Sequence, residues 1–124
     1  MNYPPAPNRF PPMMNVLKTS DDLAAALQRS HESAIVLFKH SATCPFSARA
    51  QEQVAEAKHD LPIYTVVVQY AKDVSTEIAE KLHVEHQSPQ AIVVFEGKAI
   101  DHYWRSEIQT DALIDRVGEI MENA

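Results

Sequence analysis

Apolar residues along the chain gather in short runs that alternate with segments where they recur at helical spacing. The short runs are apolar or β-branched and are bounded by turn-forming or polar residues, as buried strands are. They predict central strands over residues 34–40, 62–68 and 90–96. A turn at Glu96-Gly97 predicts a hairpin partner over 98–104. Residues 15–18 suit a short edge strand.

Four other segments carry apolar residues three and four positions apart, so that each would bury one face of a helix. They predict helices over residues 21–29, 46–58, 74–83 and 111–122. Thr19 or Ser20 is expected to cap the first helix and Thr110 the last. Outside the second helix, the residues expected to face inward are Leu23, Ala26, Leu27, Ile78, Ala79, Leu82, Leu113, Ile114, Val117 and Ile120.

The predicted elements follow the order β-α-β-α-β-α-β-β-α. The alternating part requires parallel crossovers, and the hairpin near the end adds antiparallel strands. The sequence therefore predicts an α/β protein with a central mixed sheet flanked by helices, in one domain over residues 14–124. Residues 1–13 are expected to form a disordered tail, because five of the chain's eight prolines lie within residues 1–12.

Composition narrows the classes of function. A formal net charge of −6 argues against non-specific nucleic-acid binding, which depends on Lys and Arg neutralising phosphates. No apolar run approaches the roughly 20 residues that a membrane span requires, so no membrane partner is expected. The single cysteine excludes an intramolecular disulfide. Because the N-terminus also lacks the pattern of a signal peptide, we expect a cytoplasmic protein.

The single cysteine, Cys44, follows the predicted strand 34–40 and precedes the predicted helix 46–58. Unpaired N–H groups and the helix dipole favour an anion at such a junction, and these surroundings lower the pKa of a cysteine. Cys44-Pro45-Phe46-Ser47 resembles a Cys-x-x-Cys redox motif whose second cysteine is replaced by serine. Cys44 is therefore a candidate nucleophile for thiol–disulfide exchange, and a second thiol from outside the chain must regenerate it. A buried structural cysteine is the alternative.

Residues around Cys44 suggest supporting roles. Thr43 could cap the helix, Pro45 would stiffen the loop, and the hydroxyl or N–H group of Ser47 could donate to the thiolate. A protonated His40 would also help the thiolate, although a solvent-facing histidine is the more common case at a strand end. The spacing of His83-Val84-Glu85-His86 fits neither a helical HExxH motif nor paired cysteine ligands, so no metal site is predicted.

The element order, with a redox-type cysteine after the second strand, resembles the thioredoxin fold. Ser88-Pro89, immediately before the predicted strand 90–96, resembles the cis-proline of that fold, and X–Pro bonds are where cis peptides occur. The resemblance implies that Ser88 and Pro89 lie beside Cys44 and present backbone to an extended substrate.

A more specific set of matches is dispersed from about residue 14 to the C-terminus. It comprises residues 43–47, 64, 66–69, 74–75, 78–80, 84–90 and 97–98. Together these segments resemble the YtxJ family of monothiol bacilliredoxins. The resemblance implies an oxidoreductase that removes bacillithiol from protein mixed disulfides through Cys44. Residues that would stabilise the thiolate or bind substrate are Thr43, Pro45, Phe46, Ser47, Ser88 and Pro89.

This resemblance also defines the expected partners and leaves alternatives. Bacillithiol would be a co-substrate with no permanently bound cofactor, and the partners would be bacillithiolated client proteins, the low-molecular-weight thiol and a regenerating redoxin. A redox sensor that stays modified and a glutaredoxin-like iron–sulfur carrier remain open. The second is weakened because monothiol glutaredoxins usually show Thr-Val-Pro and a Gly-Gly pair, whereas this chain has Gln87-Ser88-Pro89 and no adjacent glycines.

Some polar and aromatic residues receive no functional role from the sequence. Residues 101–108 depart from the Ser-His-Trp-like cluster that the family tends to carry after its Gly-Lys turn. Pairing of basic side chains with the carboxylates of bacillithiol is conceivable, but solvated surface charge is the expected state of Lys39, Lys98 and Arg105.

Overall fold

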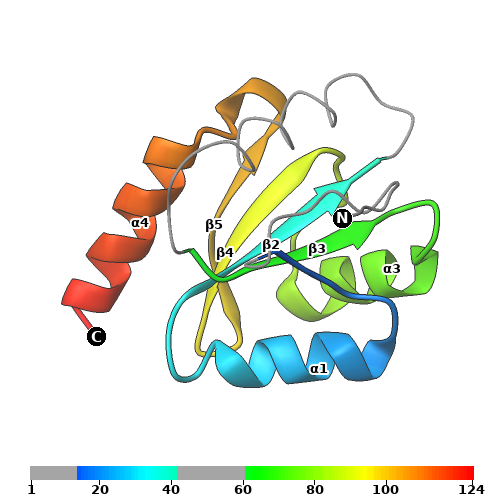
Figure 1. The fold of residues 1–124 in the computed structure, drawn as a ribbon, viewed down its shortest axis with the longest axis horizontal. Helices are drawn as coiled ribbons and strands as arrows, with labels where there is room; N and C mark the ends of the chain where they lie inside the picture. Colours follow the sequence, from blue (N-terminus) through cyan, green and yellow to red (C-terminus); the bar gives the residue numbers. More distant parts are fainter. Residues whose placement is uncertain (1–13, 42–60) are drawn as a thin grey trace, which may run out of the picture.

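A five-stranded mixed sheet forms the centre of the computed structural model, which describes residues 14–41 and 61–124 (Figure 1). Its strands are β1 (Met14–Val16), β2 (Ile35–His40), β3 (Ile63–Val67), β4 (Gln90–Phe95) and β5 (Lys98–Trp104). They lie in the order β1-β3-β2-β4-β5. The β1–β3 and β2–β3 pairs are parallel, whereas β2–β4 and β4–β5 are antiparallel. The predicted central mixed sheet is confirmed, but the expectation that its alternating part is parallel throughout is wrong for β4, which runs antiparallel to β2.

Helices cover both faces of this sheet. Helices α1 (Ser20–Arg29) and α3 (Lys72–Leu82) lie side by side on one face, and α4 (Thr110–Glu122) lies on the other (Figure 1). A short 3-10 helix, Arg105–Glu107, joins β5 to the segment before α4. The helix predicted over 46–58 and the tail predicted over 1–13 lie outside the described residues. No helix within 14–41 and 61–124 combines the length and apolar character needed to cross a membrane.

Strand β2 separates two hydrophobic cores. Ile35 and Leu37 belong to the core beneath α1 and α3, whereas Val36 and Phe38 belong to the core beneath α4. Because both faces of β2 are covered, its apolar residues are continuous rather than alternating with polar ones. Helices α1 and α3 contribute the buried residues Leu23, Ala26, Val74, Ile78 and Leu82 to the first core.

Helix α1 begins with a capping box. The hydroxyl of Thr19 accepts a hydrogen bond from the backbone N–H of Asp22 at 3.1 Å. In return, the Asp22 carboxylate accepts from the backbone N–H groups of Lys18 and Thr19 at 2.8 and 3.1 Å. These bonds, chiefly the one from Lys18, lower the pKa of Asp22. Of the two predicted caps, Thr19 and Ser20, the structure has Thr19 as the N-cap.

Replacing Thr19 with alanine is expected to lower the free energy of unfolding by about 1 kcal/mol, because the first-turn N–H of Asp22 loses its acceptor. Thr19→Ser keeps the hydroxyl and should stay close to the wild type. Urea denaturation at neutral pH measures both values. Equal stability of the alanine and serine variants would contradict a stabilising role for this cap.

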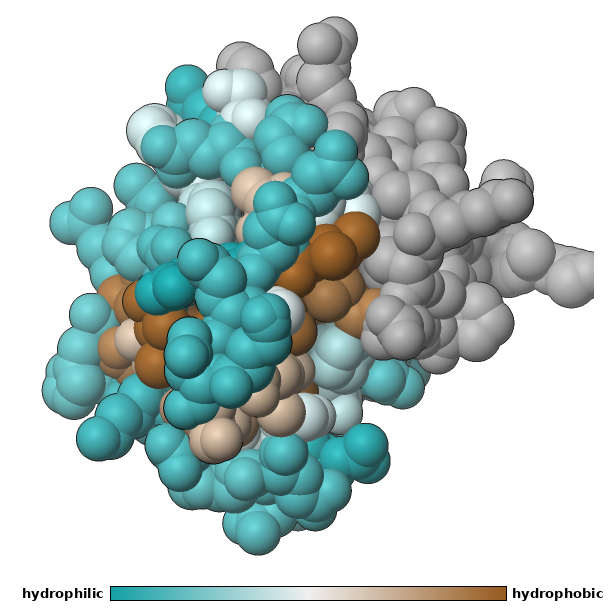
Figure 2. All heavy atoms as spheres, turned by 90° about the vertical axis from the view of Figure 1, so that its left-hand side faces the viewer, coloured by the Kyte–Doolittle hydropathy of each residue, from teal (hydrophilic) through white to brown (hydrophobic). Residues whose placement is uncertain are grey.

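Helix α4 differs from the sequence prediction at two residues. Gln109 is its N-cap, without a side-chain cap hydrogen bond, so Thr110 is the first helical residue and is only 3% exposed. The buried stripe runs through Leu113 and the partly buried Val117 and Ile120, which leaves Ile114 at its edge with 38% exposure. The predicted Thr110 cap and inward-facing Ile114 are therefore wrong. The surface on the α4 side is mostly hydrophilic, with smaller apolar patches between the polar side chains (Figure 2).

Candidate functional site

The end of β2 and the start of β4 define the described part of the site. In the antiparallel β2–β4 pair, Lys39 lies opposite Gln90. This register places Ser88 and Pro89 beside the end of β2 from which the chain continues toward Cys44. The remaining predicted site residues lie outside the described part of the chain, and their roles stay predictions: Thr43, Cys44, Pro45, Phe46 and Ser47.

The peptide bond between Ser88 and Pro89 is cis, as the sequence predicts. Pro89 is buried, and its carbonyl oxygen accepts a hydrogen bond from the backbone N–H of Arg105 at 3.3 Å. The hydroxyl oxygen of Ser88 is buried and has no hydrogen-bond partner among the described residues. The loop is thus fixed against the end of β5 through its backbone, while the Ser88 hydroxyl keeps unused hydrogen-bonding capacity.

Lys39 is buried inside the protein, contrary to its expected place on the surface. Its side chain is 0% exposed and lies on the α1–α3 side of the sheet, two positions after Leu37. Desolvation by burial lowers the pKa of Lys39 to about 8. The surface assignment is wrong because β2 is covered on both faces, so every residue of its central part is enclosed whichever way its side chain alternates.

His86 provides the polar contact for this buried lysine. Nζ of Lys39 lies 3.2 Å from Nδ1 of His86, and the hydroxyl oxygen of Ser75 on α3 lies 3.3 Å from the same nitrogen. A protonated lysine can only donate, so Nδ1 is the acceptor and the ring proton is on Nε2. Desolvation, followed by the charge of Lys39, lowers the pKa of His86 and favours this neutral ring.

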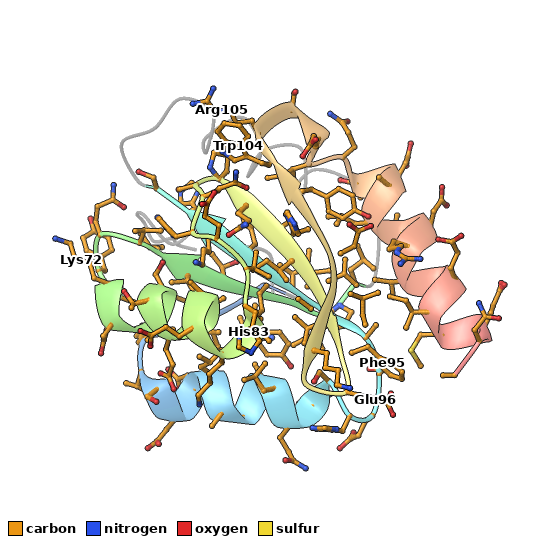
Figure 3. The ribbon with its side chains drawn as sticks, turned by 180° about the vertical axis from the view of Figure 1, so that it is seen from behind. Lys72, His83, Phe95, Glu96, Trp104 and Arg105 are labelled. Carbon is orange, nitrogen blue, oxygen red and sulfur yellow. The ribbon has the colours of Figure 1, made fainter. Side chains whose placement is uncertain are left out.

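An aromatic and cationic pair ends β5 at the same end of the sheet. The guanidinium of Arg105 lies 4.3 Å from the ring centroid of Trp104, in a cation–π arrangement. Trp104 pairs with Gln90 in the β4–β5 register, so it belongs to the cross-strand row that includes Lys39. Figure 3 shows Trp104 and Arg105 at the end of the sheet opposite the Phe95–Glu96 turn. Arg105 therefore contacts Trp104 beside the Pro89 loop.

The sequence matches a known protein family over most of its length. The sequence profile of the monothiol bacilliredoxin BrxC family matches residues 15–113. The chain belongs to the monothiol bacilliredoxin family. This confirms the resemblance found in the sequence and covers every described residue of the site. As a member of this family with a thioredoxin fold, the bacilliredoxin is a thiol–disulfide oxidoreductase.

Solved structures share the bacilliredoxin's fold. A thioredoxin-fold protein described as an oxidoreductase is 28% identical, with a TM-score of 0.75 over 83% of this chain and 92% of that chain. A poplar thioredoxin h mutant is 12% identical, with a TM-score of 0.74 over 97% and 92% of the two chains. Thioredoxin from Fasciola hepatica is 20% identical, with a TM-score of 0.62 over 86% and 98%. The last two similarities show the fold alone.

Sequence reasoning missed the Lys39–His86 contact in this bacilliredoxin. A charged residue in an otherwise apolar strand was the available signal, because Lys39 directly follows the run Ile35 to Phe38. Its partner could not be identified in the same way, since His86 comes from the segment between α3 and β4. Only the fold brings these two residues together.

Proposed function

We propose that this bacilliredoxin removes bacillithiol from protein mixed disulfides, with Cys44 as the nucleophile. The match to the monothiol bacilliredoxin family over residues 15–113 carries this proposal. The single cysteine and the cis Ser88–Pro89 bond beside the end of β2 support it. Bacillithiol would be the co-substrate, without a permanently bound cofactor, and the reducing cytoplasm would be the compartment.

The proposed exchange conserves one disulfide. The Cys44 thiolate attacks the bacillithiol sulfur of a client mixed disulfide, and a new sulfur–sulfur bond forms as the old one breaks. The client thiolate leaves and takes up a proton, so the client is reduced while Cys44 carries bacillithiol. The chain has no resolving cysteine, so a second low-molecular-weight thiol or a regenerating redoxin must release the adduct.

The surrounding residues would divide between the two reactants. In this proposal Thr43, Pro45, Phe46 and Ser47 shape the thiolate's surroundings, and Ser88 and Pro89 present backbone to the client. The β2–β4 register supports the second role, because it brings this loop to the strand end that continues toward Cys44.

Intact mass spectrometry after mixing the reduced protein with a bacillithiolated client tests the proposal. We expect one bacillithiol adduct to move to the wild type and the client to be released reduced, whereas Cys44→Ala should accept none. Cys44 should also alkylate with a pKa below about 7.5, because thiol exchange requires a thiolate at neutral pH. If no bacillithiol were transferred and Cys44 were alkylated only after denaturation, Cys44 would instead be a buried structural cysteine.

Two controls separate this function from related ones. The same client protein, carrying glutathione in place of bacillithiol, tests the preference for the small thiol. Equal rates of transfer from the two modified clients would contradict selectivity for bacillithiol. An excess of client tests turnover in the presence of free thiol. A single adduct that persists under those conditions would favour the redox sensor.

A further inference from the structure

The charge on Lys39 has no counter-charge among the described residues. Lys39 pairs with Val66 on β3 and with Gln90 on β4 in the sheet, and its ammonium contacts the imidazole of His86, which Ser75 on α3 also contacts. No described carboxylate forms a salt bridge with Lys39. An enclosed ammonium loses its hydration, which a single neutral acceptor replaces only in part. An apolar side chain would fill this place at lower cost, so the donor capacity of Lys39 calls for an explanation.

The contact made by Lys39 falls on the segment that carries Ser88 and Pro89. This segment is held at three places. Nζ of Lys39 and the hydroxyl oxygen of Ser75 meet Nδ1 of His86 at 3.2 and 3.3 Å. Nε2 of Gln90 donates to the carbonyl oxygen of Glu85 at 3.1 Å, and the N–H of Arg105 donates to the carbonyl oxygen of Pro89 at 3.3 Å. Of these contacts, only that of Lys39 comes from β2, the strand that leads toward Cys44.

We propose that Lys39 is a positioning residue, which holds the Glu85–Pro89 segment in its client-binding position by donating to Nδ1 of His86. This inference rests on the proposed function for the role of the segment, and on the described contacts for its position. Lys39 itself touches neither client nor thiol. It acts through His86, whose ring links the Lys39 side chain on β2 to the segment between α3 and β4.

The contact between Lys39 and His86 should depend on pH. Nδ1 of His86 can accept from Lys39 only while it holds no proton. The pKa of His86 is lowered from its usual 6.5, so the contact is complete near neutral pH and is lost as pH falls through that lower value. It weakens again above about pH 8, where Lys39 loses its charge. Ser75, which contacts His86, and Gln90, which pairs with Lys39 between β2 and β4, do not titrate in this range.

Nuclear magnetic resonance on the full chain tests the position of the loop without any assay of activity. In the wild type, the imidazole nitrogens of His86 should show a proton on Nε2 and an acceptor at Nδ1. Lys39→Met should raise the pKa of His86 and shift the amide signals of Gln87 and Ser88. Lys72→Met, at the exposed start of α3 (Figure 3), is the matched control and should change neither. Unchanged loop signals in Lys39→Met would overturn the proposal.

Client kinetics test the consequence for exchange. Lys39→Met and His86→Leu should each raise the KM for the bacillithiolated client about tenfold, with kcat nearly unchanged, as loss of a hydrogen bond to a charged group implies. The double variant should be no worse than either single one, because both remove the same contact. His86→Asn should restore most of the affinity, since the side-chain oxygen of asparagine can take the place of Nδ1.

The outcomes distinguish the two proposals. A wild type that transfers no bacillithiol, yet shows the expected loop shifts in Lys39→Met, would overturn the proposed function and leave the positioning contact established. Additive effects of Lys39→Met and His86→Leu on KM would overturn the positioning role. So would a loss confined to kcat.

Discussion

Replacing Lys39 with methionine is expected to raise the free energy of unfolding by about 3 kcal/mol at pH 7. Burial lowers the pKa of Lys39 from 10.5 to about 8, and each unit corresponds to about 1.4 kcal/mol of preference for the neutral form. The folded protein therefore bears a cost for keeping this side chain protonated. Methionine has a similar shape without the charge, and the hydroxyl of Ser75, which lies 3.3 Å from Nδ1 of His86 in the wild type, can serve as the alternative donor.

The pH dependence of this stability difference provides a second test of whether Lys39→Met stabilises the protein. Between pH 8 and 10.5 the unfolded chain still holds the Lys39 proton while the folded protein has released it, so the stability of the wild type rises with pH through this window. The advantage of Lys39→Met should accordingly shrink, by about 2 kcal/mol between pH 7 and 9.5. Urea denaturation of both proteins at each pH measures the difference, from which tyrosine ionisation in the unfolded chain cancels because both proteins carry the same tyrosines.

Lys72→Met is the matched control for this experiment, because Lys72 is exposed and carries the same substitution. Its stability should follow that of the wild type at every pH. A Lys39→Met protein that is less stable than the wild type at pH 7 would show that the contact with His86 outweighs the desolvation of the ammonium. A constant difference from pH 7 to 9.5 would show that the lysine does not titrate in this window.

Stability and function therefore make opposite demands at Lys39. The substitution that should strengthen the fold is the same one that should weaken client binding. Local departures from the rules for a buried strand are expected at functional sites, where stability is given up for position or charge. This opposition separates a positioning role from a merely structural one, because a structural lysine would lose stability and affinity together.

The sequence predicted the parts of the fold that depend on local patterns. The hairpin strand Lys98–Trp104 and the cap at Thr19 follow from turn residues and capping chemistry, and the structure has both as expected. The cis bond at Ser88–Pro89 followed from the resemblance to the thioredoxin fold and from its position before a strand. These features each depend on residues close together in the chain.

Features set by contacts between distant elements could not be predicted in this way. Whether Lys39 faces solvent depends on what covers β2, and its acceptor comes from 47 positions further along the chain. Ile114 repeats at helical spacing as well as Leu113 does, and only the placement of α4 on the sheet decides which is buried. Helical spacing specifies a stripe, whereas its edges are set by packing.

Truncating Phe38, the residue before Lys39, should lower the free energy of unfolding, whereas Lys39→Met should raise it. Phe38 is 1% exposed and packs in the α4-side core with Ile108 and Leu113. Phe38→Ala is expected to lower the free energy of unfolding by about 3 to 5 kcal/mol, because it removes a buried ring and leaves a cavity between β2 and α4. Phe95→Ala, at the partly exposed end of β4 (Figure 3), is the matched control and should cost clearly less.

Measuring Phe38→Ala beside Lys39→Met tests the two-sided burial of β2 directly. Adjacent residues on a strand point to opposite faces, so the two substitutions probe the α4 core and the α3 side separately. A large loss at Phe38 with a gain at Lys39 is expected only if both faces are covered and the second encloses a charge. If Phe38→Ala lowered the free energy of unfolding no more than Phe95→Ala, Phe38 would not lie in a packed core on the α4 side. The enclosure of β2 would then rest on Lys39 and the α3 side alone.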